Sequence, residues 1–134
     1  MSWDIWVQDI PEGTQSPADI PDDFQPKPFG KRSDIITRIR EAVPSADFSD
    51  PTWGKIDGPG FSIEVGMSGD ELVQSFAFHV RGGDLAAHVV ADILQHLGFR
   101  AFDPSSESGI FCIGADAADG LRRWRAYRNT VLRR

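Results

Sequence analysis

The stretch FSIEVGMSGDELVQSFAFHV, residues 61–80, decides the fold. Apolar and polar side chains alternate through residues 61–66 and again through most of residues 72–80, and Met67-Ser68-Gly69-Asp70 between them is rich in turn formers. In an extended strand, every second side chain lies on the same face. The pattern therefore predicts two antiparallel strands whose shared core face carries Phe61, Ile63, Val65, Leu72, Phe76, Phe78 and Val80.

Further strands are expected on both sides of this pair in the sequence. Residues 52–57 form a predicted strand, and a turn rich in glycine and proline joins it to the strand that starts at Phe61. Two more short strands are expected at residues 99–102 and 109–113. Residues 2–8 alternate as a half-buried strand does, with Trp3, Ile5 and Val7 inward and Asp4, Trp6 and Gln8 outward.

Three segments have the apolar spacing of helices. Ser33 can cap a helix that Pro44 ends, and Asp84 can cap a second helix that Gly98 ends in the left-handed conformation. Asp116 can cap a third helix near the C-terminus. We expect each helix to turn one apolar stripe to the core: Ile35, Ile36, Ile39, Ala42 and Val43 in the first, Leu85, Ala86, Val89, Val90, Ile93, Leu94 and Leu97 in the second, and Leu121, Trp124, Tyr127 and Val131 in the third.

The order of these elements predicts an α+β fold. Clean alternation in the strands indicates a two-layer sandwich, in which a mainly antiparallel sheet of five or six strands has helices on one face. The succession strand, helix, hairpin, helix, strand resembles a ferredoxin-like topology with an extra C-terminal helix. At 134 residues the chain has the usual length of one domain, so we expect residues 1–134 to form a single α+β domain.

A long proline-rich loop, residues 9–32, separates the first strand from the first helix. It contains five prolines, and proline fixes φ and lacks an N–H, so neither a helix nor a strand ladder is expected there. Connections in compact domains usually have about 4 to 6 residues. We expect an extended segment draped over the domain and anchored by its four large apolar side chains, Ile10, Ile20, Phe24 and Phe29.

Charge is distributed unevenly along the chain. The formal net charge is −6, but six of the 14 basic residues follow Leu121, where there is no acidic residue. The first 121 residues therefore hold 8 basic and all 20 acidic side chains, a formal charge of −12. An acidic body suits a basic partner. The arginines of the tail mix with Trp124 and Tyr127, as in some nucleic-acid binders, but we expect these aromatics to be buried and predict no nucleic-acid binding.

The sequence favours a soluble protein. Apolar runs are far shorter than the roughly 20 residues that span a bilayer, and Met1-Ser2-Trp3-Asp4 is not the start of a signal peptide. The single cysteine, Cys112, allows no disulfide within the chain, which fits a reducing compartment. We expect a cytoplasmic protein in which Cys112 is a small buried hydrophobic residue.

The outward face of the sheet is the candidate binding site. If helices cover only the other face, this one presents the binding residues Asp4, Trp6, Glu64, His79 and Arg81. We expect the proline-rich loop or a second subunit to cover Trp6, because a large exposed aromatic surface is uncommon in monomers. An acid/base pair of His79 and Glu64 is the alternative, but the sequence supplies no nucleophile for it.

Two other patterns have plain structural interpretations. Asp84, His88, Asp92 and His96 follow one another at four-residue spacing, and Asp92 with either histidine could chelate a divalent metal. The stripe drifts by about 40° per step, so the four cannot converge on one ion, and we predict a solvated helix face. Arg81-Gly82-Gly83-Asp84 could hold an anion at a helix start, but Asp84 would repel it, and a strand-to-helix turn is predicted instead.

These observations favour a binding module over an enzyme. No catalytic residue, metal site or cofactor motif is predicted, and we expect the partner to be another protein, with a homodimer as one form of it. In size and acidic charge the chain is similar to small bacterial immunity proteins, which block basic toxins; the likeness is one of profile. The alternative is a small enzyme or ligand-binding protein with its site between the residue 9–32 loop and the open sheet face.

Overall fold

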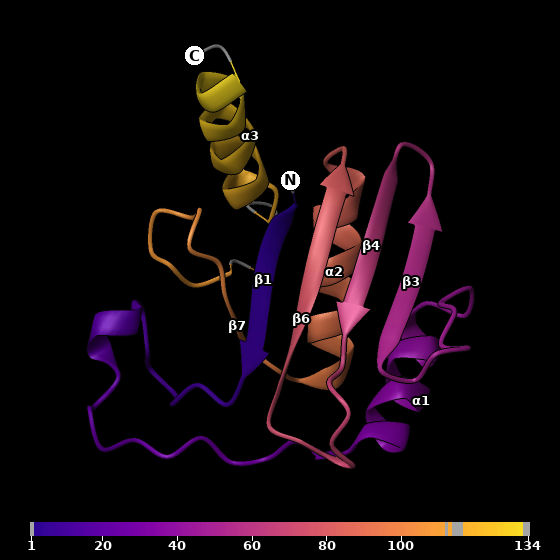
Figure 1. The fold of residues 1–134 in the computed structure, drawn as a ribbon. Helices are drawn as coiled ribbons and strands as arrows, with labels where there is room; N and C mark the ends of the chain where they lie inside the picture. Colours follow the sequence, from indigo (N-terminus) through magenta and orange to yellow (C-terminus); the bar gives the residue numbers. More distant parts are fainter. Residues whose placement is uncertain (1, 112, 114–116, 133–134) are drawn as a thin grey trace.

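The computed structural model describes residues 2–111, 113 and 117–132 and is an α+β sandwich, as predicted (Figure 1). About 32% of the chain is helix and 27% is strand. In chain order the elements are β1 (Trp3–Gln8), the 3₁₀ turn η1 (Pro17–Asp19), β2 (Gly30–Lys31), α1 (Arg32–Ala42), β3 (Trp53–Gly58), β4 (Phe61–Gly66), β5 (Leu72–Val73), β6 (Ser75–Gly82), α2 (Leu85–Leu97), β7 (Ala101–Phe102) and α3 (Asp119–Leu132).

Five strands form one antiparallel sheet in the order β3-β4-β6-β1-β7, and β2 pairs with β5 in a separate ladder. Three of the sheet's strands, β3, β4 and β6, follow one another between α1 and α2, where a ferredoxin-like succession has two. Because of this additional strand, β6 runs in the opposite direction to the last hairpin strand of a ferredoxin-like succession. It therefore pairs antiparallel with β1.

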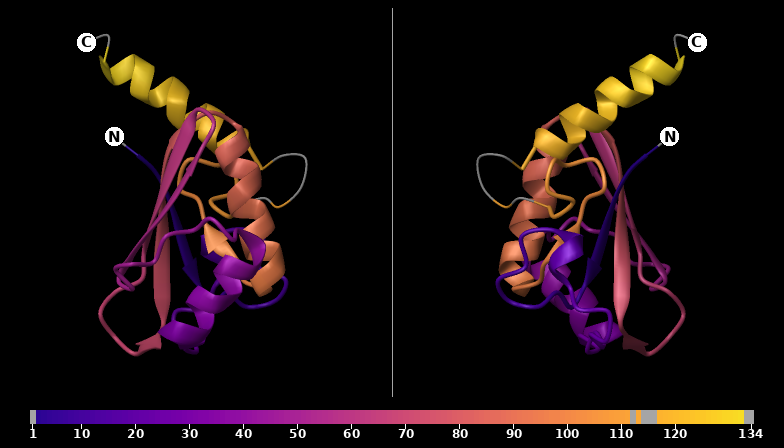
Figure 2. Two further views of the ribbon diagram at one scale, coloured as in Figure 1. Left: turned by 90° about the vertical axis from the view of Figure 1, so that its right-hand side faces the viewer. Right: turned by 90° about the vertical axis from the view of Figure 1, so that its left-hand side faces the viewer.

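One face of the sheet is buried under α1 and α2 (Figure 2). The alternation of β1 buries Trp3, Ile5 and Val7, and the same face of β6 buries Phe78 and Val80. Burial of apolar surface stabilises a domain by about 25 cal/mol per Å², so these inward rows fix which face each strand turns to the helices. The predicted single-sided helix layer is therefore confirmed.

The predicted helix end at Gly98 is confirmed, whereas the predicted caps Ser33 and Asp84 are not. Gly98 ends α2 in the left-handed conformation with φ 73°, and its N–H donates to the carbonyl of Leu94 at 2.9 Å. The predicted cap by Ser33 is wrong, because β2 leads straight into α1 and Arg32 is the first helical residue. Asp84 makes no capping bond; its carboxylate instead accepts a hydrogen bond from Arg125 at 3.0 Å.

Two inward assignments and one predicted strand are also wrong. Leu72 belongs to β5 and is exposed, because pairing with β2 draws residues 72–73 away from the sheet before β6 begins. Leu85 is 51% exposed, because the core side of α2 starts with Ala86 and Ala87. The strand predicted at residues 109–113 is reduced to one bridge, Phe102 to Ile110, and Cys112 lies outside the described residues.

The proline-rich loop is anchored mainly at its two ends. Ile10 and Thr14 are buried, and the guanidinium of Arg100 donates to the carbonyls of Pro11 at 3.1 Å and Thr14 at 2.6 Å. At the other end the ring of Phe29 stacks on Phe99 with centroids 3.9 Å apart. Ile20 and Phe24, in the middle, are half-buried. The loop lies beside the β7 edge and on the helix side of the sheet (Figure 2).

Helix α3 starts against the body and then projects from it, toward the open side of the sheet (Figures 1 and 2). Leu121 is fully buried and Trp124 is half-buried, as predicted. Tyr127 was expected inward but is 63% exposed, because the helix has left the core two turns after its start. Asp116, the predicted cap, lies outside the described residues.

Candidate functional site

The outward face of the sheet brings the five predicted binding residues together. Strand register places Asp4 opposite His79 and His79 opposite Glu64, so the three form one row across β1, β6 and β4. Arg81 lies two residues beyond His79 on the same face of β6. Trp6 lies on the next row of β1 and is 48% exposed.

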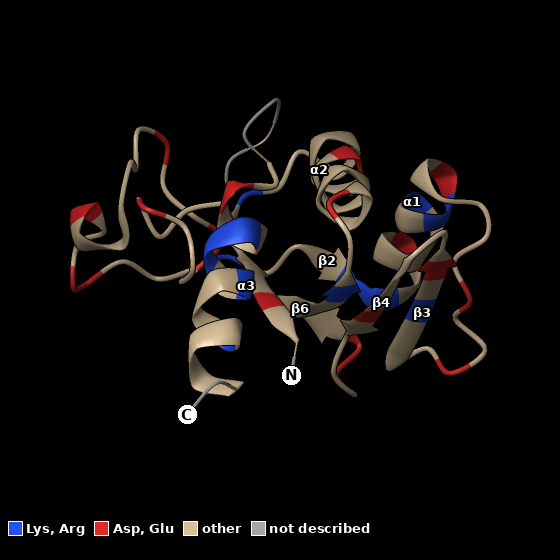
Figure 3. Cartoon of the chain, turned by 90° about the horizontal axis from the view of Figure 1, so that it is seen from above, with Lys and Arg blue, Asp and Glu red and all other residues tan. Residues whose placement is uncertain are grey.

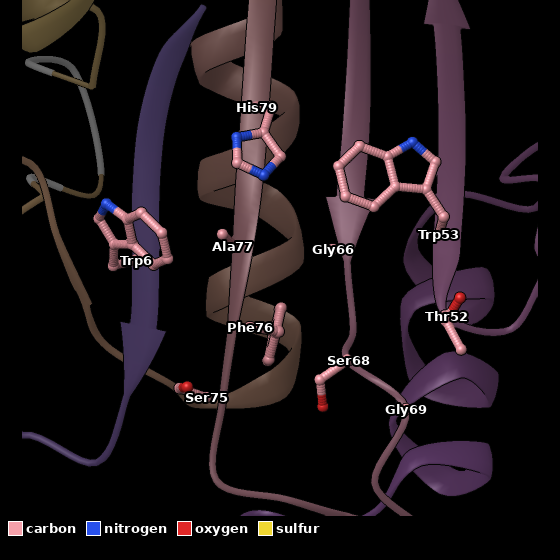
Figure 4. A pocket seen from close by; sticks show the side chains of 10 residues that line it. All are labelled: Trp6, Thr52, Trp53, Gly66, Ser68, Gly69, Ser75, Phe76, Ala77 and His79. Carbon is pink, nitrogen blue, oxygen red and sulfur yellow. The ribbon is translucent and has the colours of Figure 1, made fainter.

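An open depression of about 560 Å³ lies on this face, centred on aromatic rings (Figure 4). The imidazole of His79 stacks on the indole of Trp53, with centroids 5.4 Å apart and an interplanar angle of 20°. Trp6 presents its ring edge-on to the same imidazole at 6.3 Å. The three rings line the depression, and Trp53, like Trp6, is only partly covered, with 39% of its surface exposed.

His79 pairs with Asp4 and not with Glu64. Its Nδ1 lies 2.8 Å from the Oδ1 of Asp4, which also accepts the hydroxyl of Ser2 at 2.6 Å. A carboxylate only accepts hydrogen bonds, so the neutral imidazole carries its proton on Nδ1 and leaves Nε2 as an acceptor. The alternative of an acid/base pair between His79 and Glu64 is not supported, because no hydrogen bond joins the two in the described part of the chain. The partner of His79 is Asp4, which faces it directly across the ladder.

Glu64 joins two other side chains of the same face. Its Oε2 accepts the indole N–H of Trp53 at 2.6 Å, and its Oε1 pairs with the guanidinium of Arg81. The hydrogen bond from Trp53 and the pairing with Arg81 hold the pKa of Glu64 below its ordinary value, against a smaller opposing effect of burial. The carboxylate therefore stays ionised and fixes Trp53 and Arg81 in place.

This arrangement combines aromatic rings with paired polar side chains. Among the described residues, no serine, threonine or cysteine side chain is hydrogen-bonded to His79. The rings offer an apolar surface framed by Asp4, which is bonded to His79, and by Glu64, which is paired with Arg81. Such a mixture of aromatic centre and polar rim is typical of protein interfaces.

The proline-rich loop contributes nothing to this depression. Residues 9–32 supply none of its lining side chains and lie on the other side of the sheet (Figure 2). The predicted position of a site, between the loop and the open face, is therefore wrong, and so is the expected cover of Trp6 by the loop. The cause lies in Arg100 and Phe99, which bind the loop ends at the β7 edge.

Trp53 is the site residue that the sequence interpretation missed. The signal was present, because Gly54 and Ile56 alternate with Trp53 and Lys55, which puts Trp53 on the outward face. A phenyl ring, that of Phe48, occupies the inward space that a Cβ on Gly54 would need. Tryptophan is highly buried on average, so its residue type alone favours an inward position and only the alternation indicates the outward one.

The acidic and basic side chains along α2 have separate partners. Asp84 binds Arg125, and the Nε2 of His96 lies 3.1 Å from Glu41 on α1. Among residues 2–111, 113 and 117–132, no group of three or more His, Cys, Asp or Glu side chains could hold a metal ion. The turn at Arg81-Gly82-Gly83 is shaped by packing, because Gly82 has φ 110° and a Cβ there would overlap the backbone of Gly60 and Phe61.

Comparisons with known proteins give no relative: no family model, curated protein or solved structure matches the chain. In the described part of the chain no helix combines the length and the apolar character needed to cross a membrane.

Proposed function

We propose that this protein is a non-catalytic module that binds another protein through the open face of its sheet. The main observation that supports this proposal is the partly exposed pair of tryptophans, Trp6 and Trp53, on either side of His79 in a shallow depression. Exposed apolar patches of this kind mark interaction sites on soluble domains. Tryptophan is also the residue type most enriched among the side chains that dominate binding energy.

The polar frame of this surface supports the proposal. Asp4 and Glu64 hold His79 and Trp53 in fixed orientations through short hydrogen bonds, so the rings lose little freedom when a partner covers them. A rigid aromatic centre needs less ordering on binding than a mobile one. This proposal includes a cytoplasmic location, which the lone cysteine favours.

A second copy of the chain is the other candidate occupant. Helix α3 projects past the body with Tyr127 and Leu132 exposed and carries Arg122, Arg123, Arg125 and Arg128 (Figure 3). Its positive charge complements the −12 of the first 121 residues. A two-fold dimer that uses α3 and the open face would bury both apolar surfaces.

The test is capture of a partner by the full chain, with a W6A/W53A double variant and a Leu85→Ala control. Leu85 is exposed to the same extent but lies on α2, in the other layer. We expect one protein to be enriched by the wild type and the control and lost by the double variant. The captured protein, purified and titrated calorimetrically, should bind the double variant at least about tenfold more weakly. If no purified candidate distinguishes the double variant from the wild type, the proposal is wrong.

A further inference from the structure

The depression on the open face is a groove with aromatic walls and a floor of small residues. Strand register places Trp6, Ala77, Gly66 and Trp53 in one row across β1, β6, β4 and β3. Neighbouring strands are about 4.8 Å apart, so the backbones that carry the two tryptophans are separated by about 14 Å. The stacked His79 closes one end, and the other end runs out between Ser68 and Ser75 (Figure 4).

The floor is kept low by the residue types that occupy it. A Cβ on Gly66 would lie 3.2 Å from the Trp53 ring and 3.5 Å from the Nε2 of His79. A Cβ there would require the Trp53 ring to shift by a few tenths of an ångström. Ala77, between Trp6 and Gly66, adds only one methyl group. The groove therefore has the depth to receive a row of atoms between its walls.

A ligand of this groove must bind through side-chain surfaces. The two central strands beneath it, β6 and β4, are each paired on both sides, in the ladders β1·β6, β6·β4 and β4·β3, so their backbone groups are already satisfied. A peptide cannot add to β6 or β4 as another strand, because that mode needs a free sheet edge, and an edge of this sheet lies at β3, beyond the Trp53 wall. What the groove offers is ring surface and the carboxylates around it.

Carboxylates are gathered at both ends of the groove. Asp4 and Glu64 lie at the His79 end. Asp70 and Glu71, just past the Ser68-Gly69 end, are exposed. The guanidinium of Arg32 lies at the same end, where it donates to the carbonyls of Ser68 at 3.1 Å and Asp70 at 3.4 Å, and Arg81 is paired with Glu64, so the two arginines offset part of this charge. The excess of acid favours a cationic ligand.

From this geometry we infer that the groove binds an extended, proline-containing peptide segment that carries lysine or arginine; the inference rests on the proposed function and names its partner class. A polyproline II segment is extended before it binds and so loses little entropy. Its rings pack on aromatic walls, and its prolines have no N–H that would need an acceptor. Its cationic side chains gain from the tryptophan faces and from the carboxylates at the ends.

A saccharide would fit the tryptophans but not the polar groups. Sugar recognition needs several free donors and acceptors, and here Asp4 is committed to His79 while Glu64 is committed to Trp53 and Arg81. Thr52, on the groove wall, donates its hydroxyl to Asp50 at 2.7 Å. Of the described side chains that line the groove, the Nε2 of His79 and the hydroxyls of Ser68 and Ser75 are left for a ligand, which favours a ligand that needs few hydrogen bonds.

The test uses three synthetic peptides of about twelve residues, built from Pro-Pro-Lys, Gly-Ser-Lys or Pro-Pro-Glu repeats, and a neutral β-linked glucose oligosaccharide. Calorimetry with the full-length chain should show the Pro-Pro-Lys peptide binding at least about tenfold more tightly than the other three probes. Trp6→Ala and Trp53→Ala should each weaken it by about tenfold, and Leu85→Ala should leave it unchanged.

A floor-filling variant keeps the test independent of the tryptophans. Ala77 is only 4% exposed, so the larger side chain of Ala77→Val presses against its neighbours in the groove, and binding should fall several-fold. Valine suits a strand, and circular dichroism with thermal unfolding checks that the variant keeps the fold. Equal binding of the Gly-Ser-Lys peptide, binding of the oligosaccharide alone, or binding unaffected by Trp6→Ala and Trp53→Ala would each overturn the inference. If no peptide binds but a captured partner still depends on Trp6 and Trp53, the peptide inference fails and the binding function stands.

Discussion

The imidazole of His79 and the carboxylate of Asp4 are joined by a hydrogen bond of 2.8 Å across the β1·β6 ladder. This bond determines both the orientation and the tautomer of the imidazole. It holds the ring flat against Trp53, and it assigns the proton of the neutral imidazole to Nδ1. The orientation of the central ring of the groove therefore depends on a residue 75 positions away in the chain.

This relationship predicts a tautomer. In the wild type, the ring nitrogen shifts of the neutral form of His79 should be those of an Nδ1–H imidazole. Asp4→Ala removes the acceptor, so the Nε2–H form, the commoner one in solution, should gain population. Two-dimensional ¹⁵N–¹H spectra that correlate ring nitrogens with ring protons measure this directly. An unchanged tautomer in Asp4→Ala would contradict the assigned role, and His96, paired with Glu41 through Nε2, is the internal control.

The lowered pKa of Glu64 leads to a second prediction, which concerns the stability of the protein as a function of pH. Because its folded pKa is held below the ordinary 4.5 by Trp53 and Arg81, its contribution to stability is present above pH 4.5 and is lost as pH falls through the folded pKa. Glu64→Gln lacks this ionisation. We expect the variant to be less stable than the wild type near neutral pH and the gap to close in acid. Urea unfolding at several pH values measures the gap, and a gap that is constant or widens in acid would refute the assignment.

The sequence predicted the layers, the open face and its residues, because alternation in residues 2–8 and 61–80 reports directly which side chains face the core. It could not predict that His79 would form its hydrogen bond with Asp4 and not with Glu64. Both carboxylates flank the histidine, and only side-chain geometry decides between them. The wrong position of the proline-rich loop has a similar cause, because the bonds from Arg100 to Pro11 and Thr14 join segments with no sequence pattern in common.

A third prediction concerns the start of α3. Gly120 packs against the carboxylate of Asp103 so closely that a Cβ would overlap it. Gly120→Ala should therefore destabilise the fold by about 1–3 kcal/mol, although alanine is the better helix former. Gly69→Ala is the matched control, because nothing lies within 4 Å of its Cβ position. Thermal unfolding of the two variants measures the difference, and equal midpoints would show that this contact is not tight.

Docking of α3 gives a fourth prediction. Leu121 is fully buried, whereas the bond between Arg125 and Asp84 is at the surface, where an ion pair is worth under about 1 kcal/mol. Leu121→Ala should speed amide exchange throughout α3 and leave the sheet protected, and Asp84→Ala should change it little. Hydrogen-exchange mass spectrometry separates the two. Equal loss of protection in β6 and α3 would mean that the helix does not open on its own.

Asp103 predicts a pH effect of the opposite sign to that of Glu64. Burial raises its pKa above the ordinary 3.8, although the carboxylate accepts the indole N–H of Trp3 at 2.9 Å and backbone N–H bonds. Its contribution to stability is therefore fully present below pH 3.8 and is lost as pH rises through the raised pKa. Asp103→Asn keeps an acceptor for Trp3 and has no ionisation to lose.

The stability of Asp103→Asn relative to the wild type should therefore increase as pH rises from 3.8 upward, whatever its value in acid. The other carboxylates are common to both proteins, so their titration largely cancels in the difference. Urea unfolding of the pair from acid to neutral pH measures this, with Glu64→Gln as the variant whose difference from the wild type changes in the opposite direction. A difference that does not vary with pH would show that Asp103 titrates in the folded protein as it does in the unfolded chain.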